Sequence, residues 1–174
     1  MTRNPHRGHD ALRRGRSSQP TATYFLTLCT EERHIGLTHP TLASAILAES
    51  HALTTDTTWS LISATVMPDH LHLLITLGDR LSLEKTISRL KAKTSALLKA
   101  HTSALIWQRG FFDHKLRADE PLAALLLYIY LNPYRAQLCE ADTTWPWFYC
   151  RADEWRWFKD SLHSDLPQPE WLSD

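Results

Sequence analysis

Two histidines, His70 and His72, stand one residue apart in the apolar stretch VMPDHLHLLITL, and their spacing suggests chemistry. Side chains two residues apart in a strand project to the same side, so the two imidazoles would lie close together. Two protonated rings would repel each other, whereas neutral imidazoles are common ligands of a divalent metal. A third ligand must then come from elsewhere in the chain. A pair of partly exposed strand histidines without any role is the alternative.

The segment YIYLNPYR, residues 128–135, offers a second group of reactive side chains. On a helix, Tyr128 and Asn132 are four residues apart and share a face. The amide oxygen of Asn132 could complete a metal site with the two imidazoles, and the Tyr128 hydroxyl would lie one turn away. A phenol is a weak nucleophile at neutral pH, so a metal would help mainly by polarising and orienting a phosphate under attack. Aromatic packing at a helix end that stops at Asn-Pro is the alternative.

The elements that would position these side chains follow from the hydrophobic patterning. We predict strands at residues 23–30, 58–67, 71–77 and 111–117, and helices at residues 39–55, 82–101 and 119–132. Only the tripeptide PDH separates the second and third strands, which indicates a tight antiparallel hairpin. The order β-α-β-β-α-β-α is that of a split βαβ fold. We therefore expect an α+β, ferredoxin-like antiparallel sheet with helices on one face, plus a C-terminal helix and an aromatic-rich tail.

Local signals suggest where the helices begin and end. Thr38 or Thr41 is expected to cap the helix at 39–55, and Pro133 is expected to lie just beyond the helix at 119–132. The apolar face of the helix at 82–101 is predicted from its spacing and comprises Leu83, Ile87, Leu90, Thr94 and Leu97.

The chain has 174 residues, enough for one domain with a sizeable core. We divide it into a flexible basic arm (1–20), a main domain (21–150) and an acidic tail (151–174) rich in tryptophan. No stretch of apolar residues is long enough for a membrane span, and the arginine-rich N-terminus does not resemble a secretory signal. The three cysteines are widely spaced and form no CxxC pair, so we expect a reducing, cytoplasmic location.

The charge is distributed unevenly although its sum is zero. Residues 1–20 hold five arginines and one acid, and residues 80–117 hold nine basic and two acidic residues. Such segments can form a surface for a polyanion within a neutral protein, although solvated helix faces would give the same pattern.

Four segments together resemble a known family: TYFLTLCT, VMPDHLHLLI, IWQRGFFDHKLR and YIYLNPYRAQL. Their order and spacing are similar to those of REP-associated tyrosine transposases, which belong to the transposase-like branch of the HUH single-strand endonucleases. The resemblance spans about residues 23–150. It implies a ferredoxin-like fold and cutting and rejoining of single-stranded DNA beside hairpin-forming palindromic repeats.

The resemblance also implies roles for individual residues. Tyr128 would attack a backbone phosphate, form a covalent 5′-phosphotyrosine and release a 3′-hydroxyl. His70 and His72 would bind a divalent metal, Mg²⁺ or Mn²⁺, with Asn132 as the third ligand, and on ligand softness this set suits Mn²⁺ at least as well as Mg²⁺. Tyr130 lies about 200° around the helix from Tyr128, so the two cannot face one metal together.

Several basic and aromatic residues are candidates for DNA contacts. The basic candidates are Arg3, Arg7, Arg13, Arg14 and Arg16 in the arm, the helical stripe Lys85, Arg89 and Lys93, and the separate Arg117 and Arg135. Trp107, Phe111 and Phe112 could stack on unpaired bases, or could equally belong to the core.

Two other functions fit parts of the sequence. A relative that has lost cleavage would bind hairpin DNA or RNA without cutting it. A different metal hydrolase would attack with a metal-bound water and keep Tyr128 only for packing. The sequence leaves open whether the protein acts as a monomer or as a homodimer.

Overall fold

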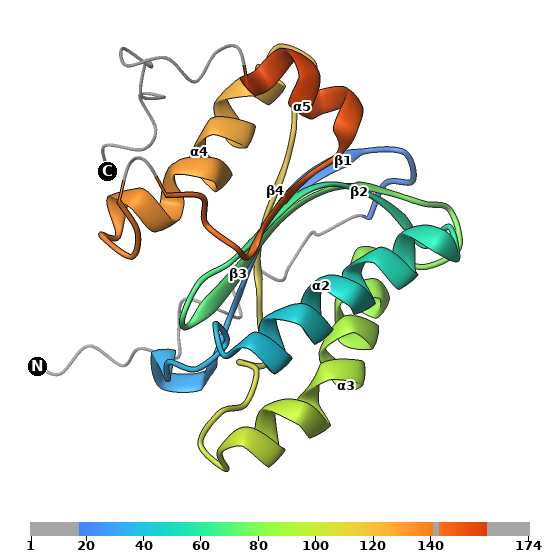
Figure 1. Cartoon of the computed structure of the whole chain (residues 1–174). Coiled ribbons are helices and arrows are strands. Elements are labelled where there is room, and N and C mark those ends of the chain that lie inside the picture. The colour runs from blue at the N-terminus through green and yellow to red at the C-terminus, as the bar shows by residue number, and fades with distance from the viewer. Residues whose placement is uncertain (1–17, 141–142, 160–174) are drawn as a thin grey trace, which may run out of the picture.

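The computed structural model describes residues 18–140 and 143–159, which form a five-stranded sheet between two layers of helices (Figure 1). The strands are β1 (Thr23–Cys29), β2 (Trp59–Val66), β3 (His70–Leu77), β4 (Phe112–Lys115) and β5 (Phe148–Cys150). The helices are α2 (Pro40–Thr55), α3 (Leu83–His101), α4 (Leu122–Arg135) and α5 (Ala152–Phe158), with a short 3₁₀ helix η1 at Glu31–Arg33. The predicted order of strands and helices is confirmed.

The sheet is antiparallel throughout, and its strand order is β4-β1-β3-β2-β5. β3, which carries both histidines, is therefore the central strand. The predicted hairpin of β2 and β3 is confirmed, and the Met67 amide donates to the His70 carbonyl at 2.8 Å where the chain turns.

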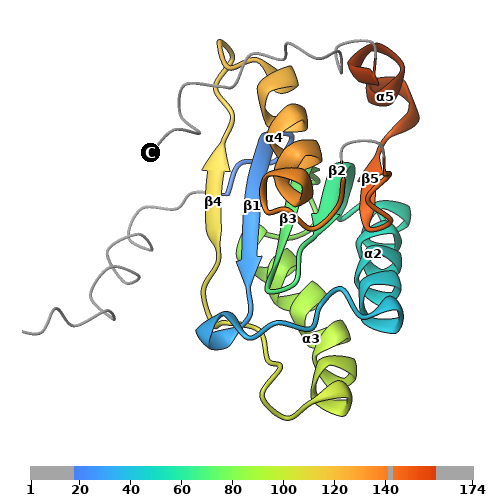
Figure 2. The same ribbon diagram turned by 60° about the vertical axis from the view of Figure 1, so that its left-hand side comes forward.

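One face of the sheet packs against α2 and α3, as expected for the ferredoxin-like part (Figure 2). Alternate residues of β3, among them Leu71, Leu73 and Ile75, lie on this face and are fully buried. They pack with Ile46 of α2 and Leu90 of α3. Burial of these aliphatic side chains supplies most of the driving force for this layer.

The C-terminal helix α4 covers the opposite face, together with α5 (Figure 1). A second apolar cluster forms there, in which Leu74 of β3 packs against Leu126 and Ile129 of α4. Phe158, from the segment assigned to the acidic tail, is 1% exposed in this cluster. β5 was not predicted, because its three residues become a strand only through pairing with β2.

Three local predictions were wrong. His39 occupies the N-cap of α2 without a side-chain cap, so neither threonine caps it, and Pro40 begins the helix instead, where its missing N–H costs nothing. Pro133 lies within α4, which continues to Arg135. Leu98 rather than Leu97 is buried on α3, and Leu97 is 41% exposed.

None of the helices in the described ranges combines the length and apolar character that crossing a membrane requires.

Candidate active site

The two histidines of β3 project together from the face that α4 covers, as their spacing predicts. Their Nε2 atoms lie 3.1 Å apart, and their ring centroids are 4.6 Å apart. His72 is buried at 3% exposure, while His70 is partly exposed. Two imidazole nitrogens thus converge on one point at the sheet surface.

Each imidazole is held by a hydrogen bond at its other nitrogen. Nδ1 of His70 lies 2.6 Å from Oδ1 of Asp69, and a carboxylate oxygen only accepts, so the proton is on Nδ1 and Nε2 keeps its lone pair. Nδ1 of His72 lies 2.9 Å from the hydroxyl of Thr27, its cross-strand partner on β1. When this hydroxyl accepts, both Nε2 lone pairs face the same point, which is the arrangement of a supported metal ligand pair.

Arg33 of η1 contacts Asp69, the residue that holds His70 in place. Its Nε lies 2.6 Å from Oδ2 of Asp69, and its Nη1 lies 2.8 Å from Sγ of Cys29. The backbone of Arg33 has φ of 59°, a left-handed conformation that is uncommon for a residue with a β-carbon. Sequence reasoning missed Arg33, Asp69 and Thr27 as contributors to the site.

Burial sets the protonation of the pair. It lowers the pKa of His70, while hydrogen bonds with Asp69 and Asn132 act in the opposite direction. Burial also lowers the pKa of His72 well below its usual value, and the neighbouring charges of His70 and Arg33 add to this shift. Both rings are therefore neutral near pH 7, which is the form that binds metals.

Helix α4 brings Tyr128 and Asn132 to the histidines. The ring centroid of Tyr128 lies 5.2 Å from that of His72 and 5.5 Å from that of Phe25. The side chain of Asn132 lies within hydrogen-bonding reach of His70. The helix is held there by its buried leucines and Ile129, which pack over β2 and β3. The structure thus gathers all four residues that the sequence nominated for catalysis and metal binding.

The other two tyrosines of α4 have structural surroundings. Tyr130 packs against Phe148, Trp155 and Phe158, with ring centroids 5.2–6.0 Å away. The hydroxyl of Tyr134 donates to the carbonyl of Thr143 at 2.9 Å, and burial raises the pKa of this phenol. These contacts leave Tyr128 as the tyrosine that faces the histidines.

The donor set fits a divalent metal with open coordination positions. No group of three or more His, Cys, Asp or Glu residues within the described part of the chain could hold an ion. The candidate ligands are those expected from the sequence, the two imidazole nitrogens and the Asn132 amide oxygen, whose side chains lie near one another. Three such ligands would leave coordination positions for phosphate oxygens and water, and the set suits Mn²⁺ at least as well as Mg²⁺, which prefers oxygen ligands.

The remaining candidates are spread over both faces. Lys85, Arg89 and Lys93 are exposed on α3, on the opposite side of the sheet from the histidines, and Arg89 pairs with Asp56 at 2.7 Å. Arg117 follows β4 and Arg135 ends α4, and both are exposed. Arg3, Arg7, Arg13, Arg14 and Arg16 lie outside the described residues.

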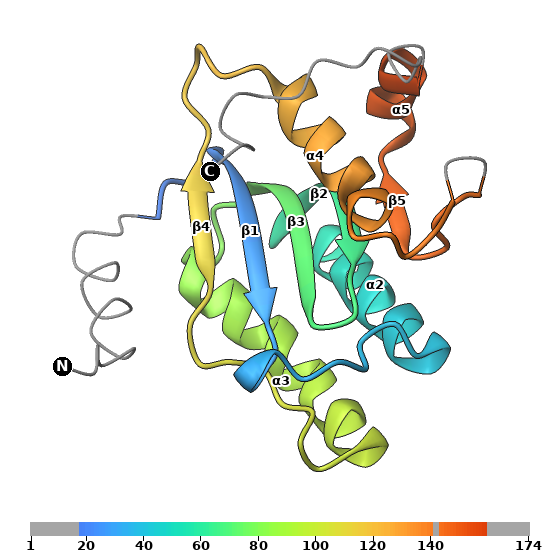
Figure 3. The same cartoon turned by 90° about the vertical axis from the view of Figure 1, so that its left-hand side faces the viewer.

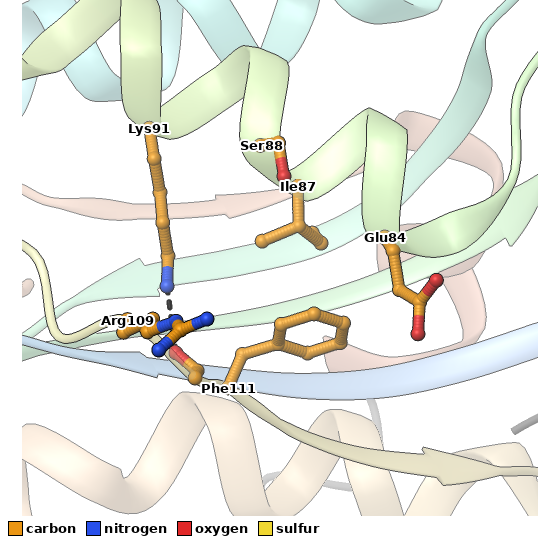
Figure 4. Close-up of a pocket in the computed structure, with 7 residues that line it drawn as sticks. Glu84, Ile87, Ser88, Lys91, Arg109 and Phe111 are labelled. Carbon is orange, nitrogen blue, oxygen red and sulfur yellow. Dashed lines mark hydrogen bonds between the residues drawn. The ribbon is translucent and has the colours of Figure 1, made fainter. Parts of the chain in front are cut away.

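A pocket of about 310 Å³ lies between α3 and the segment that leads into β4 (Figure 4). Lys91 donates there to the carbonyls of Gln108 and Gly110 at 2.7 and 2.6 Å, beside Arg109 and Phe111. Because Phe111 packs with the α2 and α3 layer, this pocket is on the far side of the sheet from Tyr128.

Residues 18–131, well over half of the chain, match the family described as "Transposase IS200 like". The chain belongs to the IS200-like transposase family. The matched segment includes the histidine pair and Tyr128, and it ends one residue before Asn132.

Individual relatives agree with this assignment. The chain is 32% identical over 98 residues to a Haemophilus influenzae protein described as a REP-associated tyrosine transposase, a match that covers 49% of this chain and 56% of that protein. A solved structure of a REP-associated tyrosine transposase bound to a REP hairpin superposes with a TM-score of 0.69 at 20% identity. It covers 89% of this chain and 93% of the other, so the two share a fold. The resemblance noted in the sequence is confirmed.

Proposed function

We propose that this protein is a divalent-metal-dependent, single-tyrosine endonuclease and strand transferase. Its substrate would be single-stranded DNA beside hairpin-forming palindromic repeats. The observation that carries the proposal is the approach of the Tyr128 ring to the convergent histidine pair, with ring centroids 5.2 Å apart. A nucleophile and a set of metal ligands then meet on one face of the sheet.

The side chains of the site have distinct tasks in this reaction. The phenol oxygen of Tyr128 attacks a backbone phosphorus, a P–O bond to tyrosine forms, and the P–O3′ bond breaks. The phenol loses one proton and the departing 3′-oxygen gains one, so the step neither takes up nor releases a net proton. Phe25 packs edge-on against Tyr128 and stacks with His72 at 5.3 Å, which fixes the direction of the phenol.

His70, His72 and Asn132 would hold the divalent ion. When bound, the ion polarises the phosphate and stabilises the charge that develops on it. Asp69 and Thr27 keep both imidazoles in the orientation and tautomer for ligation.

The covalent product explains how such an enzyme rejoins strands without a nucleotide cofactor. The phosphotyrosine bond conserves the energy of the phosphodiester bond that was broken. A 3′-hydroxyl, from the same strand or another, attacks the phosphotyrosine and releases Tyr128. The hairpin-bound relative with the same fold supports a hairpin substrate for this chain.

A covalent adduct on a denaturing gel tests the proposal. The protein is incubated with Mn²⁺ and a panel of end-labelled DNA hairpins with single-stranded flanks. We expect a shifted band that resists denaturation and disappears with Tyr128→Phe. Tyr130→Phe is the matched control. It also removes a phenol hydroxyl from α4, but Tyr130 lies two residues from Tyr128 and inside an aromatic cluster.

The other outcomes identify the rival functions. Cleaved ends without an adduct would indicate attack by a metal-bound water. Binding to hairpins without cleavage would indicate a non-cleaving module. An adduct that survives Tyr128→Phe would show that another residue is the nucleophile.

A further inference from the structure

Phe112 is exposed among the described strand residues on the sheet face that carries His70 and His72, which we call the histidine face. Phe112 of β4 pairs with Thr27 of β1, and Thr27 pairs in turn with His72 of β3. Residues directly opposite each other in a sheet share a face, so the three side chains form one row beside the histidine pair. With neighbouring strands about 4.8 Å apart, Phe112 starts about 10 Å from His72.

The three aromatic residues near β4 have different surroundings. Trp107 is 9% exposed, and its Nε1 donates to the hydroxyl of Thr94 at 2.9 Å. Phe111 packs against the core under α3. Phe112 is 52% exposed and touches the site through Phe25, whose ring centroid is 6.4 Å away. Of these three, Phe112 alone presents its ring to solvent on the histidine face.

Within residues 18–140 and 143–159, the helices that cover this face pack over β2 and β3 rather than over β4. α4 packs over β2 and β3, whereas β4 is the edge strand on the other side of β1 (Figure 3). Along β4, the next residue on the same face is His114, whose Nε2 lies 2.8 Å from Oε2 of Glu120. The same carboxylate oxygen accepts from the Arg117 amide at 2.9 Å. Phe112 and His114 thus follow one another on the same face of this edge strand, and Glu120 accepts hydrogen bonds just beyond its end.

We propose that Phe112 is a stacking platform for one unpaired base of the DNA strand next to the scissile phosphate. The inference rests on the proposed function, because it uses Tyr128 to locate that phosphate. Phe25 touches both rings, so a base on Phe112 and a phosphate at Tyr128 occupy adjacent places on the same surface. A solvent-facing phenyl ring serves any base, since every base has an aromatic face, so the platform positions the strand without reading its sequence.

The test combines a change in the protein with a change in the DNA. The DNA that forms the adduct is synthesised with a single abasic site at each position flanking the cut in turn. Binding is measured by fluorescence anisotropy in the Tyr128→Phe background, and adduct formation is measured with Tyr128 intact. Phe112→Ala should weaken binding to intact DNA by about 5- to 150-fold, the range for loss of one stacked base.

One abasic position should reveal the partner of Phe112. There, the wild-type ring gains nothing from the missing base, so Phe112→Ala and the abasic site should not weaken binding further in combination than either does alone. Phe112→Trp should retain affinity and Phe112→Leu should lose it, which separates stacking from general apolar contact. Trp157→Ala is the control, since Trp157 is 42% exposed on α5, beyond α4 from the site.

Either of two results would overturn the inference: equal affinity of Phe112→Ala and its parent, or additive losses at every abasic position. If the protein forms the adduct and Phe112→Ala leaves the DNA affinity unchanged, the stacking platform is rejected and the proposed nuclease function stands. If no DNA yields an adduct, the proposed function fails. Binding to a labelled thymidine strand of about 12 nucleotides, within the usual range for single-strand sites, then decides on Phe112 alone.

Discussion

Alternate residues of β3 have different surroundings on the two faces of the sheet, one packed for stability and the other carrying the candidate site. Leu71, Leu73 and Ile75 are fully buried against α2 and α3, whereas His70 and His72 point toward α4. The first face is sealed by aliphatic packing. The second carries hydrogen-bonded imidazoles and an opening toward β4. The proposed site therefore lies on the face that carries more polar side chains.

The histidine face also retains a buried polar group without a hydrogen-bond partner. Oγ1 of Thr65, the residue that pairs with His72 on β2, is buried and has no hydrogen-bond partner among the described residues. A buried polar atom without a partner destabilises a fold by about 1–3 kcal/mol. Four predictions test whether the two faces are as separate as this comparison indicates.

Leu73→Ala should have the largest effect, and only on stability. Removing a fully buried leucine lowers the free energy of unfolding by about 2–5 kcal/mol, which urea denaturation measures. At temperatures where the variant stays folded, its adduct yield should match that of the parent. A selective loss of adduct formation in the folded variant would show that the faces are coupled.

His72→Gln, at the neighbouring residue of the same strand, should reduce metal affinity more than it reduces stability. The change removes a candidate metal ligand, so Mn²⁺ affinity should fall by more than the roughly 10- to 100-fold typical for loss of a supporting contact. Isothermal titration with Mn²⁺ measures this fall. Unfolding should shift less than with Leu73→Ala. Unchanged Mn²⁺ affinity would remove His72 from the metal site.

Thr27→Val should weaken the site more mildly. The substitution keeps the shape and deletes the hydroxyl at Nδ1 of His72, so Mn²⁺ affinity should fall about tenfold. Thr23→Val is the matched control, because Thr23 makes a hydroxyl contact with Thr76 on the same pair of strands, away from the histidines. Equal effects of the two changes would show that Thr27 does not orient His72.

Replacing Lys85 and Lys93 together by glutamine should have the smallest effect. Both lie on α3, behind the sheet, so DNA affinity and its dependence on salt should stay the same. Arg117→Gln, just beyond the end of the edge strand β4 that carries Phe112, should reduce the slope of log affinity against log salt by roughly 0.7–0.9. A similar reduction with the lysine pair would show that the DNA extends around to α3.

The fold could be predicted because its elements carry strong local patterns. The hairpin could be predicted from the pattern of β3 and the short turn before it. Long segments with helical spacing of apolar residues likewise predicted α2 and α3. β5 was not predicted because it forms through pairing with Ser63 and Thr65 of β2. α5 was not predicted because burial of Phe158 stabilises it. The extension of α4 through Pro133 likewise depends on tertiary packing, since the proline is buried.

The site was predictable only where its members are close in sequence or share a helix face. The spacing of His70 and His72, and that of Tyr128 and Asn132, could be read directly. Thr27 could not, because its place depends on the register between β1 and β3. Asp69 was visible beside His70, but its carboxylate gained a role only with the hairpin geometry. The exposure of Phe112 could not be predicted, because it depends on which strands α4 packs over.

The strand order also has a consequence for how rigid each part of the site is. The histidines occupy the central strand, hydrogen-bonded on both sides, whereas Phe112 lies on a four-residue edge strand. In amide hydrogen exchange, β3 should therefore be among the last segments to open, and β4 among the first. If the proposed function holds, the candidate metal ligands would stay fixed in the sheet while the edge strand beside them adapts to each DNA strand.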